Sequence, residues 1–311
     1  MQAFFVVPLD NKIKSRNPMQ KGEQKGRQVS PKFSLVLCTI NRKEEVDKFL
    51  QSLSRQTLSE FEVIIVDQNK DGLLDPVIAK WRELLTIEHL KVDFQGLSRA
   101  RNFGIKYIKE GLIAFPDDDC EYLPSTLENT YIFMRQNPKA SIVIGKQCSK
   151  ICRGNENILT QVEEIKDPLN IFKSKAISFT IFARFSDINQ LGPAFFDEKL
   201  GVGAGTKWGS GEATDFLIRA HRLGITIFKQ PAIEIFHPVK ISSPRRCLHY
   251  GLGRYKVIKK NDLGCIIYAI NVLQPMIRLF LKSEYRFLLS HICTALGRSG
   301  LPLLFSNFWI R

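Results

Sequence analysis

The part of the sequence best suited to chemistry is a run of three aspartates, Asp117–Asp119. They directly follow the apolar stretch at 112–115 and Pro116. Adjacent carboxylates raise each other's pKa and repel, so this arrangement costs free energy unless a cation or a cluster of donors lies beside it. The alternative is a solvated acidic turn, which is the usual environment of a charge run. The elements that flank the aspartates decide between the two.

Strand-like and helix-like segments alternate before the aspartates. Continuous apolar runs at 33–38, 61–67 and 112–115 predict strands buried on both faces, and a further strand is expected at 87–92. Apolar residues recur at helical spacing between these strands. Strand–helix units with short connections predict an α/β fold, with a mostly parallel sheet flanked by helices.

In such sheets ligands bind just beyond the carboxyl ends of the strands. Thr39, Asn41, Asp67 and Asp117–Asp119 all follow or end predicted strands. The convergence of these polar residues on one edge favours a functional acidic triplet over a solvated turn. Beyond it, we expect strands at 141–145 and 177–185, a glycine-rich loop over 201–215 that enters a helix, and a strand within 224–238 that leads to His237.

Composition sets the broad class of protein. The 311 residues carry a formal net charge of +14, which favours anionic partners. No nucleic-acid module is recognisable, so we do not expect nucleic acid among them. Seven irregularly spaced cysteines are expected to be reduced thiols of a cytoplasmic protein. The start of the chain is a poor secretory signal, and residues 1–31 are expected to form a flexible basic arm.

Four stretches, taken in order, resemble the inverting glycosyltransferases of family 2, which have the GT-A fold and use nucleotide sugars. They are "SLVLCTINRKEEVDKFLQSLSRQT", "EVIIVDQNKDG", "QGLSRARNFGIKY" followed by "FPDDDC", and "GAGTKWGSGEATDFLIRAHRLG" followed by "IFHP". The resemblance implies a GT-A domain over 32–240. The remaining segment, 241–311, is expected to be helical.

The resemblance assigns a D-x-D pair to Asp117 and Asp119. It implies that Asp117 lies nearer the ribose and that Asp119 holds Mg²⁺ or Mn²⁺, since hard cations prefer carboxylate oxygens. The role of Asp118, counted here with the nucleotide-sugar site, stays open. His237 resembles a further metal ligand of some relatives; the alternative is a surface histidine at a strand end.

The nucleotide site is implied by the same resemblance. Thr39 and Asn41 are expected to line the nucleoside pocket, and Asp67 to accept hydrogen bonds from the base, unless it only caps the next turn. Arg99 is placed to contact the base or the diphosphate. Arg101 is a second candidate, although an arginine on a helix is more often solvated or ion-paired.

An inverting transferase also needs a carboxylate base that takes the proton of the acceptor hydroxyl. Relatives commonly have an adjacent Glu-Asp pair here, but this sequence has Glu212, Ala213 and, three residues after the glutamate, Asp215. Glu212 is favoured because it lies closer to the glycine loop, whereas Asp215 has an alternative partner in Arg219. Trp208 is a candidate to stack on an acceptor sugar, or else packs into the core.

The segment 241–311 is basic and apolar. Its longest charge-free run, 263–277, is shorter than the roughly 20 residues that cross a bilayer. Basic residues between apolar turns predict helices in the interface of an anionic membrane. The alternative is a helical lobe that packs on the catalytic domain.

These features together predict a metal-dependent, hexosyltransferase-like inverting enzyme. Its acceptor is expected to be a glycan or lipid-linked glycan of a bacterial surface polysaccharide, and its location the cytoplasmic face of the plasma membrane. A catalytically impaired nucleotide-sugar-binding protein of the same fold is the alternative that Ala213 suggests. A nucleotidyltransferase is disfavoured because "CTINRKEE" lacks the glycines of that class.

Overall fold

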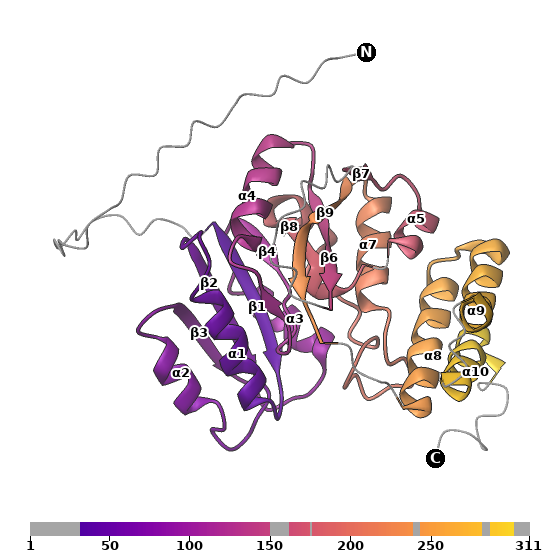
Figure 1. Ribbon diagram of the computed structural model, residues 1–311, viewed down its shortest axis with the longest axis horizontal. Coiled ribbons are helices and arrows are strands. Elements are labelled where there is room, and N and C mark those ends of the chain that lie inside the picture. The colour runs from indigo at the N-terminus through magenta and orange to yellow at the C-terminus, as the bar shows by residue number, and fades with distance from the viewer. Residues whose placement is uncertain (1–31, 150–161, 175, 239–242, 282–286, 302–311) are drawn as a thin grey trace, which may run out of the picture.

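The computed structural model describes residues 32–149, 162–174, 176–238, 243–281 and 287–301. The arm expected at 1–31 lies outside these ranges. The described part of the chain has one mixed sheet with helices on both faces, followed by three helices at the C-terminal end (Figure 1).

The first four strands are parallel and bear out the predicted α/β organisation. They are β1 (Phe33–Thr39), β2 (Phe61–Asp67), β3 (Thr86–Lys91) and β4 (Leu112–Ala114), and they lie in the order β3-β2-β1-β4. In the register of β1 and β2, Thr39 lies opposite Asp67. The strands therefore end together at one edge, and the aspartates follow β4 at that edge.

The other half of the sheet is less regular. It contains β5 (Glu121–Tyr122), β6 (Ile142–Cys148), β7 (Glu163–Glu164), β8 (Ile181–Arg184) and β9 (Ile227–Phe236). The strand β8 runs antiparallel to both β4 and β6, whereas β6 and β9 return to the direction of β4. The strand expected over 177–185 is shorter than predicted, because residues Ser178–Thr180 form a 3₁₀ turn, η1, before β8.

The sheet is buried on both faces, which explains its continuous apolar runs. Side chains alternate along β1, so that Phe33, Leu35 and Leu37 lie in one core while Val36 and Cys38 lie in the other. The first core is covered by α1 (Lys43–Leu53), α2 (Asp75–Trp81) and α4 (Thr126–Gln136), and the second by α3 (Leu97–Ile105) and α7 (Glu212–Arg222).

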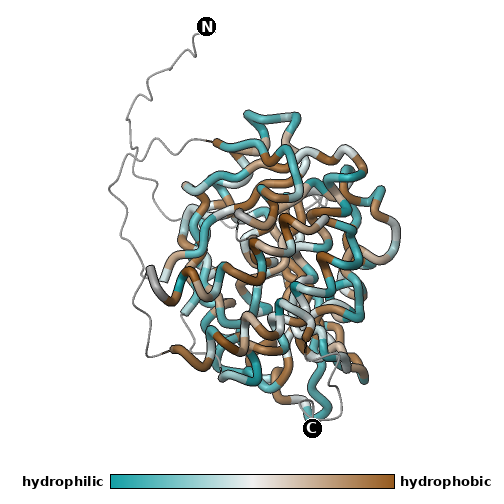
Figure 2. The backbone as a smooth tube through the Cα atoms, turned by 90° about the vertical axis from the view of Figure 1, so that its right-hand side faces the viewer, coloured by the Kyte–Doolittle hydropathy of each residue, from teal (hydrophilic) through white to brown (hydrophobic). Residues whose placement is uncertain are grey.

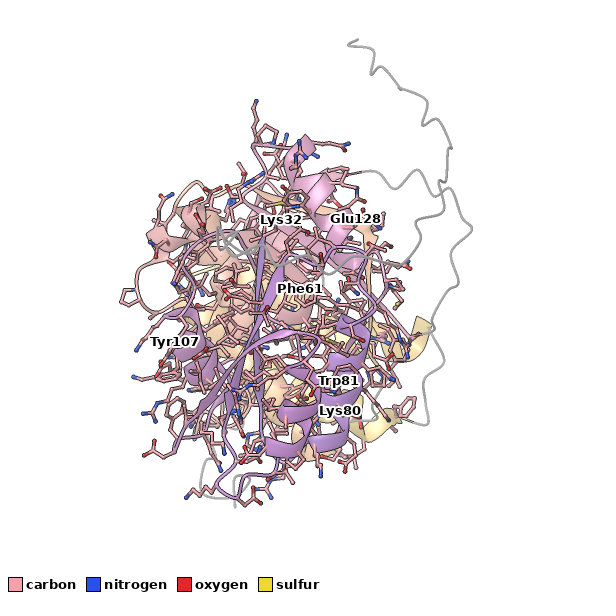
Figure 3. The ribbon with its side chains drawn as sticks, turned by 90° about the vertical axis from the view of Figure 1, so that its left-hand side faces the viewer. Lys32, Phe61, Lys80, Trp81, Tyr107 and Glu128 are labelled. Atoms are coloured by element: carbon pink, nitrogen blue, oxygen red, sulfur yellow. The ribbon has the colours of Figure 1, made fainter. Side chains whose placement is uncertain are left out.

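The outer side of the first core is visible in Figure 3, where the labelled Lys80 and Trp81 lie together on α2. The indole nitrogen of Trp81 donates to Asp47 on α1 at 2.7 Å, and the Lys80 ammonium contacts the same carboxylate at 2.8 Å. These contacts fix α2 against α1. Short elements α5 (Pro168–Lys173), α6 (Phe185–Ile188) and η2 (Asn189–Leu191) connect the strands of the second half.

The expected C-terminal helices are α8 (Pro244–Lys260), α9 (Gly264–Leu281) and α10 (Leu288–Ser299), which lie beside α7 in Figure 1. Glycines allow α8 and α10 to pack closely. A Cβ on Gly251 would lie 2.6 Å from the backbone carbonyl oxygen of Thr294, and a Cβ on Gly297 would lie 2.3 Å from that of Leu248. None of the helices within the described residues is both long enough and apolar enough to span a bilayer. Figure 2 faces the side of the molecule where these three helices lie and shows apolar stretches there.

Candidate active site

The three aspartates lie in a cluster of donors and cations. Asp118 accepts a hydrogen bond from the Thr39 hydroxyl at 2.8 Å and contacts the Arg42 guanidinium at 3.1 Å. Asp119 contacts the same Arg42 nitrogen at 2.9 Å and the His237 Nε2 at 3.0 Å. The triplet is therefore not a solvated turn, because the chain supplies compensating groups from β1, the loop after it and the end of β9.

Burial disfavours the charged form of two of these carboxyls. It raises the pKa of Asp118 to about 6, although Arg42 and the Thr39 hydroxyl both act in the opposite direction. Burial also raises the pKa of Asp117, against the charge of Arg101. Neighbouring carboxylates add to both shifts. A further positive charge at this position would relieve that repulsion.

Asp117, Asp119 and His237 form a set that fits a divalent cation. One ligand atom from each lies within 4.8 Å of the others. Two carboxylate oxygens and one imidazole nitrogen suit Mn²⁺, which takes oxygen and nitrogen ligands. Phe179 stacks on the His237 ring, with centroids 4.7 Å apart and planes 3° apart, and so fixes its orientation. Burial lowers the pKa of His237, but the hydrogen bond to Asp119 and the charges of Asp119 and Asp117 together outweigh this and raise the pKa.

Arg101 connects this set to the proposed base. Its side chain has no exposed surface, and it contacts Asp117 at 2.8 Å, the Ser178 hydroxyl at 2.8 Å and Glu212 at 3.6 Å. Its Nε and Nη1 atoms have no hydrogen-bond partner among the described residues. An arginine on a helix is commonly solvated or ion-paired, and the structure places Arg101 in ion pairs.

Glu212 begins α7, directly after the glycine loop. Its cap residue Gly211 has φ of 101°, a conformation that favours glycine. The Glu212 side chain is 14% exposed. Burial raises the pKa of its carboxyl, while the charge of Arg101 acts against that rise. A carboxylate with a raised pKa is the kind of group that accepts a proton near neutral pH.

Asp215 has a different set of partners from Glu212. Its carboxylate is completely buried and contacts Arg219 at 2.9 Å, Lys260 at 2.9 Å and the Asn261 amide at 2.9 Å. These partners join α7 to the end of α8. The structure thus separates Asp215 from Glu212 and gives it the structural partner, Arg219, that the sequence offers as the alternative.

Two of the expected nucleoside-binding residues are linked through Asn69. Both Asp67 oxygens are engaged: Oδ2 contacts His89 Nε2 at 2.9 Å, and Oδ1 accepts from the Asn69 backbone and side chain. Burial raises the pKa of Asp67, but these hydrogen bonds outweigh it and lower the pKa. The backbone N–H of Asn41 donates to the Asn69 Oδ1 at 2.7 Å, and Asn41 has a positive φ of 57°. Asp67 therefore shapes the turn that holds this loop.

Arg99 and Trp208 are not brought into the cluster. Arg99 is exposed, with its guanidinium 4.1 Å from the centroid of the Phe94 ring. Trp208 packs against the second core, and the ammonium groups of Lys207 and Lys256 lie 5.4 and 5.6 Å from its ring centroid. Each keeps its assigned role only as a prediction.

Three residues of the site were not predicted from the sequence. Arg42 follows Asn41 at a strand end, so its position was a usable signal for a cation beside the triplet. Ser178 and Phe179 carried no comparable signal, because the turn that contains them is far from the other site residues in the sequence.

Comparison with known proteins shows which family the chain resembles. Residues 34–188 match the model of glycosyl transferase family 2. An uncharacterized glycosyltransferase of Haemophilus influenzae is 29% identical over 133 residues, which is 42% of this chain and 44% of that protein. The Staphylococcus aureus poly(ribitol-phosphate) beta-N-acetylglucosaminyltransferase TarP is 30% identical over 119 residues, 37% of this chain and 36% of TarP. Each alignment thus spans less than half of the relative.

Solved structures share the fold. The mannosyltransferase PcManGT of Pyrobaculum calidifontis, in complex with GDP-Man and Mn²⁺, aligns with a TM-score of 0.61 at 13% identity, over 91% of this chain and 88% of its own. The S. aureus TarS fragment 1–349 with UDP-GlcNAc aligns with a TM-score of 0.58 at 20% identity, over 75% and 66% of the two chains. Through its domain at 34–188, the chain belongs to glycosyl transferase family 2 and has the GT-A fold.

Proposed function

We propose that the protein is a metal-dependent inverting glycosyltransferase. It transfers a hexose from a nucleoside diphosphate sugar to a glycan or lipid-linked glycan of a bacterial surface polysaccharide. The observation that carries this proposal is the connection of a metal-ligand set, Asp117, Asp119 and His237, to a buried carboxylate, Glu212, through Arg101. Relatives include enzymes of bacterial polysaccharide synthesis, such as the amylovoran biosynthesis glycosyltransferase AmsE of Erwinia amylovora.

Asp117, Asp119 and His237 would hold Mn²⁺ or Mg²⁺, and the ion would neutralise the charge that develops on the departing nucleoside diphosphate. Arg42, which contacts Asp118 and Asp119, adds a positive charge on the same side. Thr39 holds the Asp118 carboxylate in place through its hydroxyl. The nucleoside is expected in the neighbouring loops after β1 and β2.

Glu212 accepts the proton of the acceptor hydroxyl in this mechanism. The hydroxyl oxygen bonds to the anomeric carbon while the bond from that carbon to the diphosphate oxygen breaks, and attack from the opposite face inverts the configuration. Arg101 contacts Glu212 at 3.6 Å and so holds the carboxylate beside the donor site. The glycine loop before Glu212 is suited to close over the donor and exclude water.

The direct test is release of nucleoside diphosphate from a panel of UDP-, GDP- and dTDP-sugars in the presence of Mn²⁺. The proposal expects one donor to be turned over by the wild type and not by Asp119→Asn or Glu212→Gln. Donor binding without turnover in the wild type would instead support the catalytically impaired binding protein. Absence of both binding and turnover for every donor would refute both.

We also propose that α9 rests on the anionic cytoplasmic surface of the plasma membrane, where nucleotide sugars are available. Ile266, Ile270, Leu273 and Ile277 repeat at helical spacing and are 70%, 44%, 55% and 52% exposed. Within the described residues from 243 onward the only acid is Asp262, whereas lysines and arginines are frequent. An apolar row on a basic lobe is the pattern of an interfacial helix.

A further inference from the structure

A cavity lies next to the candidate active site, between the glycine loop and the start of α8. Its volume is about 390 Å³. One wall is formed by residues 201–206 and Gly209 of the loop, and the other by the cap and first two turns of the helix. The side chains that give it polar character are Thr206, Ser243, Arg245, Arg246, His249 and Tyr250.

The lining is cationic and contains no aspartate or glutamate. Neither Arg245 nor Arg246 forms an ion pair with a carboxylate of the described chain, and both are exposed. The Arg246 Nε donates to the Tyr250 hydroxyl at 2.7 Å, which orients its guanidinium along the wall. Two guanidinium groups without a carboxylate form a site for an external anion, since their planar donors match phosphate oxygens.

The position of the two arginines in α8 is unfavourable for the helix itself. The helix begins at Pro244 after the cap Ser243, whose hydroxyl accepts from the Arg246 amide at 3.3 Å, and its first turn contains no acid. Positive side chains at the positive end of a helix dipole reduce helix stability. A bound anion would reverse that effect, because it would be attracted both by the side chains and by the helix end.

The cavity is adjacent to the proposed base. A methyl group on Gly201, which lines the cavity, would lie 3.3 Å from the Glu212 Oε2. The loop is also fastened to α8, because the Gly209 amide donates to the His249 carbonyl at 3.2 Å and the Ser210 hydroxyl donates to the Tyr250 carbonyl at 2.8 Å. Gly201 is therefore a common neighbour of the cavity and of the Glu212 carboxylate.

We infer that this cavity binds a phosphate group of the acceptor, held by Arg245 and Arg246, and so presents a neighbouring hydroxyl to Glu212. The acceptor is then a phosphorylated sugar or polyol, either soluble or carried on a lipid. Tyr250 and His249 supply the flat surfaces against which a sugar ring or polyol chain packs. This inference rests on the proposed function, because it places the acceptor site beside the proposed base.

The test uses the full chain and glycerol 3-phosphate as the probe, with glycerol and glycerate for comparison. Titration calorimetry is expected to show binding of glycerol 3-phosphate and none of glycerol. The double variant Arg245→Gln/Arg246→Gln is expected to bind it about tenfold more weakly or worse, since hydrogen bonds to charged groups of this kind are lost. Equal or tighter binding of glycerate would overturn the phosphate assignment in favour of a carboxylate.

The control variant is Arg55→Gln/Arg82→Gln, which removes the same charge from two exposed arginines near α1 and α2. It is expected to bind glycerol 3-phosphate like the wild type. The melting temperature of Arg245→Gln/Arg246→Gln is expected to stay the same or rise, because two unfavourable charges leave the start of α8. Equal loss of binding in both double variants would show attraction by overall charge and overturn the inference.

A second arm locates the phosphate. Phosphatidylcholine vesicles with and without phosphatidic acid are sedimented with the wild type and the Arg245→Gln/Arg246→Gln variant. Retention that needs both phosphatidic acid and the two arginines assigns a lipid phosphate, and glycerol 3-phosphate binding without such retention assigns a soluble one. Failure of the wild type to bind either probe would overturn the inference.

The donor is measured separately so that the two proposals can fail independently. Binding of the active donor with Mn²⁺ is expected to be unchanged in Arg245→Gln/Arg246→Gln and lost in Asp119→Asn, which in turn keeps its affinity for glycerol 3-phosphate. If the double arginine variant loses donor binding, the cavity serves the donor diphosphate and the acceptor assignment is wrong. Loss of the proposed function alone would appear as phosphate binding without turnover of any donor.

Discussion

Arg101 contacts Asp117 at 2.8 Å with a side chain that has no exposed surface. A buried guanidinium costs less free energy when carboxylates compensate its charge, and here Asp117 and Glu212 both do so. The metal-ligand set and the proposed base are therefore held by one side chain, from the middle of α3.

Replacing Arg101 by methionine is expected to lower the free energy of unfolding by about 3 kcal/mol, because it leaves two carboxylates partly buried without their cation. Urea denaturation measures this. Arg99→Met, two residues earlier on the same helix, removes an exposed guanidinium that stacks on Phe94 and is expected to cost about 0.5–1 kcal/mol. Similar costs for the two variants would contradict the bridging role of Arg101.

Metal binding is expected to depend on Asp119 and not on Asp118. With a nucleoside diphosphate present, Mn²⁺ should raise the melting temperature of the wild type and of Asp118→Asn, because Asp118 is outside the set of possible ligands. Asp119→Asn should remove this rise, and His237→Gln should reduce it. A rise that survives in Asp119→Asn would rule out the proposed metal site.

Glu212 and Asp215 are expected to fail in different ways. Glu212→Gln should reduce turnover by about 10²–10⁴-fold while the protein stays folded, as for a lost general base. Asp215→Asn should instead lower the free energy of unfolding by about 3 kcal/mol, because Lys260 and Arg219 lose their buried partner. Its turnover per folded molecule should stay near that of the wild type. Reversed outcomes would make Asp215 the base.

The acidic limb of the pH profile of kcat/KM is expected above the ordinary glutamate value of 4.5, because burial raises the pKa of Glu212. A base acts when deprotonated, so activity is full above the raised pKa and falls as the pH drops through it. Circular dichroism over the same range separates this from unfolding. A limb at or below 4.5 in a folded enzyme would exclude Glu212 as the base.

Membrane attachment is expected to depend on the exposed row of α9. Ile270→Glu/Leu273→Glu should reduce co-sedimentation with phosphatidylglycerol vesicles by about tenfold or more, since burial of each such side chain contributes about 1.5–3 kcal/mol. The matched control Leu84→Glu/Ile132→Glu changes two exposed apolar residues of the catalytic domain and should have no effect. Equal losses in both variants would indicate attraction by charge alone.

The sequence by itself determined the sheet and the acidic triplet. The runs of β1, β2 and β4 are apolar at successive positions because both faces of the sheet are covered, and this local pattern also fixes where Thr39, Asp67 and Asp117 emerge. The position of Glu212 could also be predicted from local sequence, because a glycine loop followed by a helical pattern marks the start of α7.

Only the tertiary structure decided which charges meet. Arg101 was open between a contact with the donor, solvent and an ion pair until packing of α3 against the sheet buried it beside Asp117. Asp215 was distinguished from Glu212 by its contacts with Lys260 and Asn261 at the end of α8. His237 reaches Asp119 because β9 lies beside β6 and β5 in the sheet. Such contacts join residues far apart in the chain, and their energies depend on distance and burial, which spacing along a sequence does not contain.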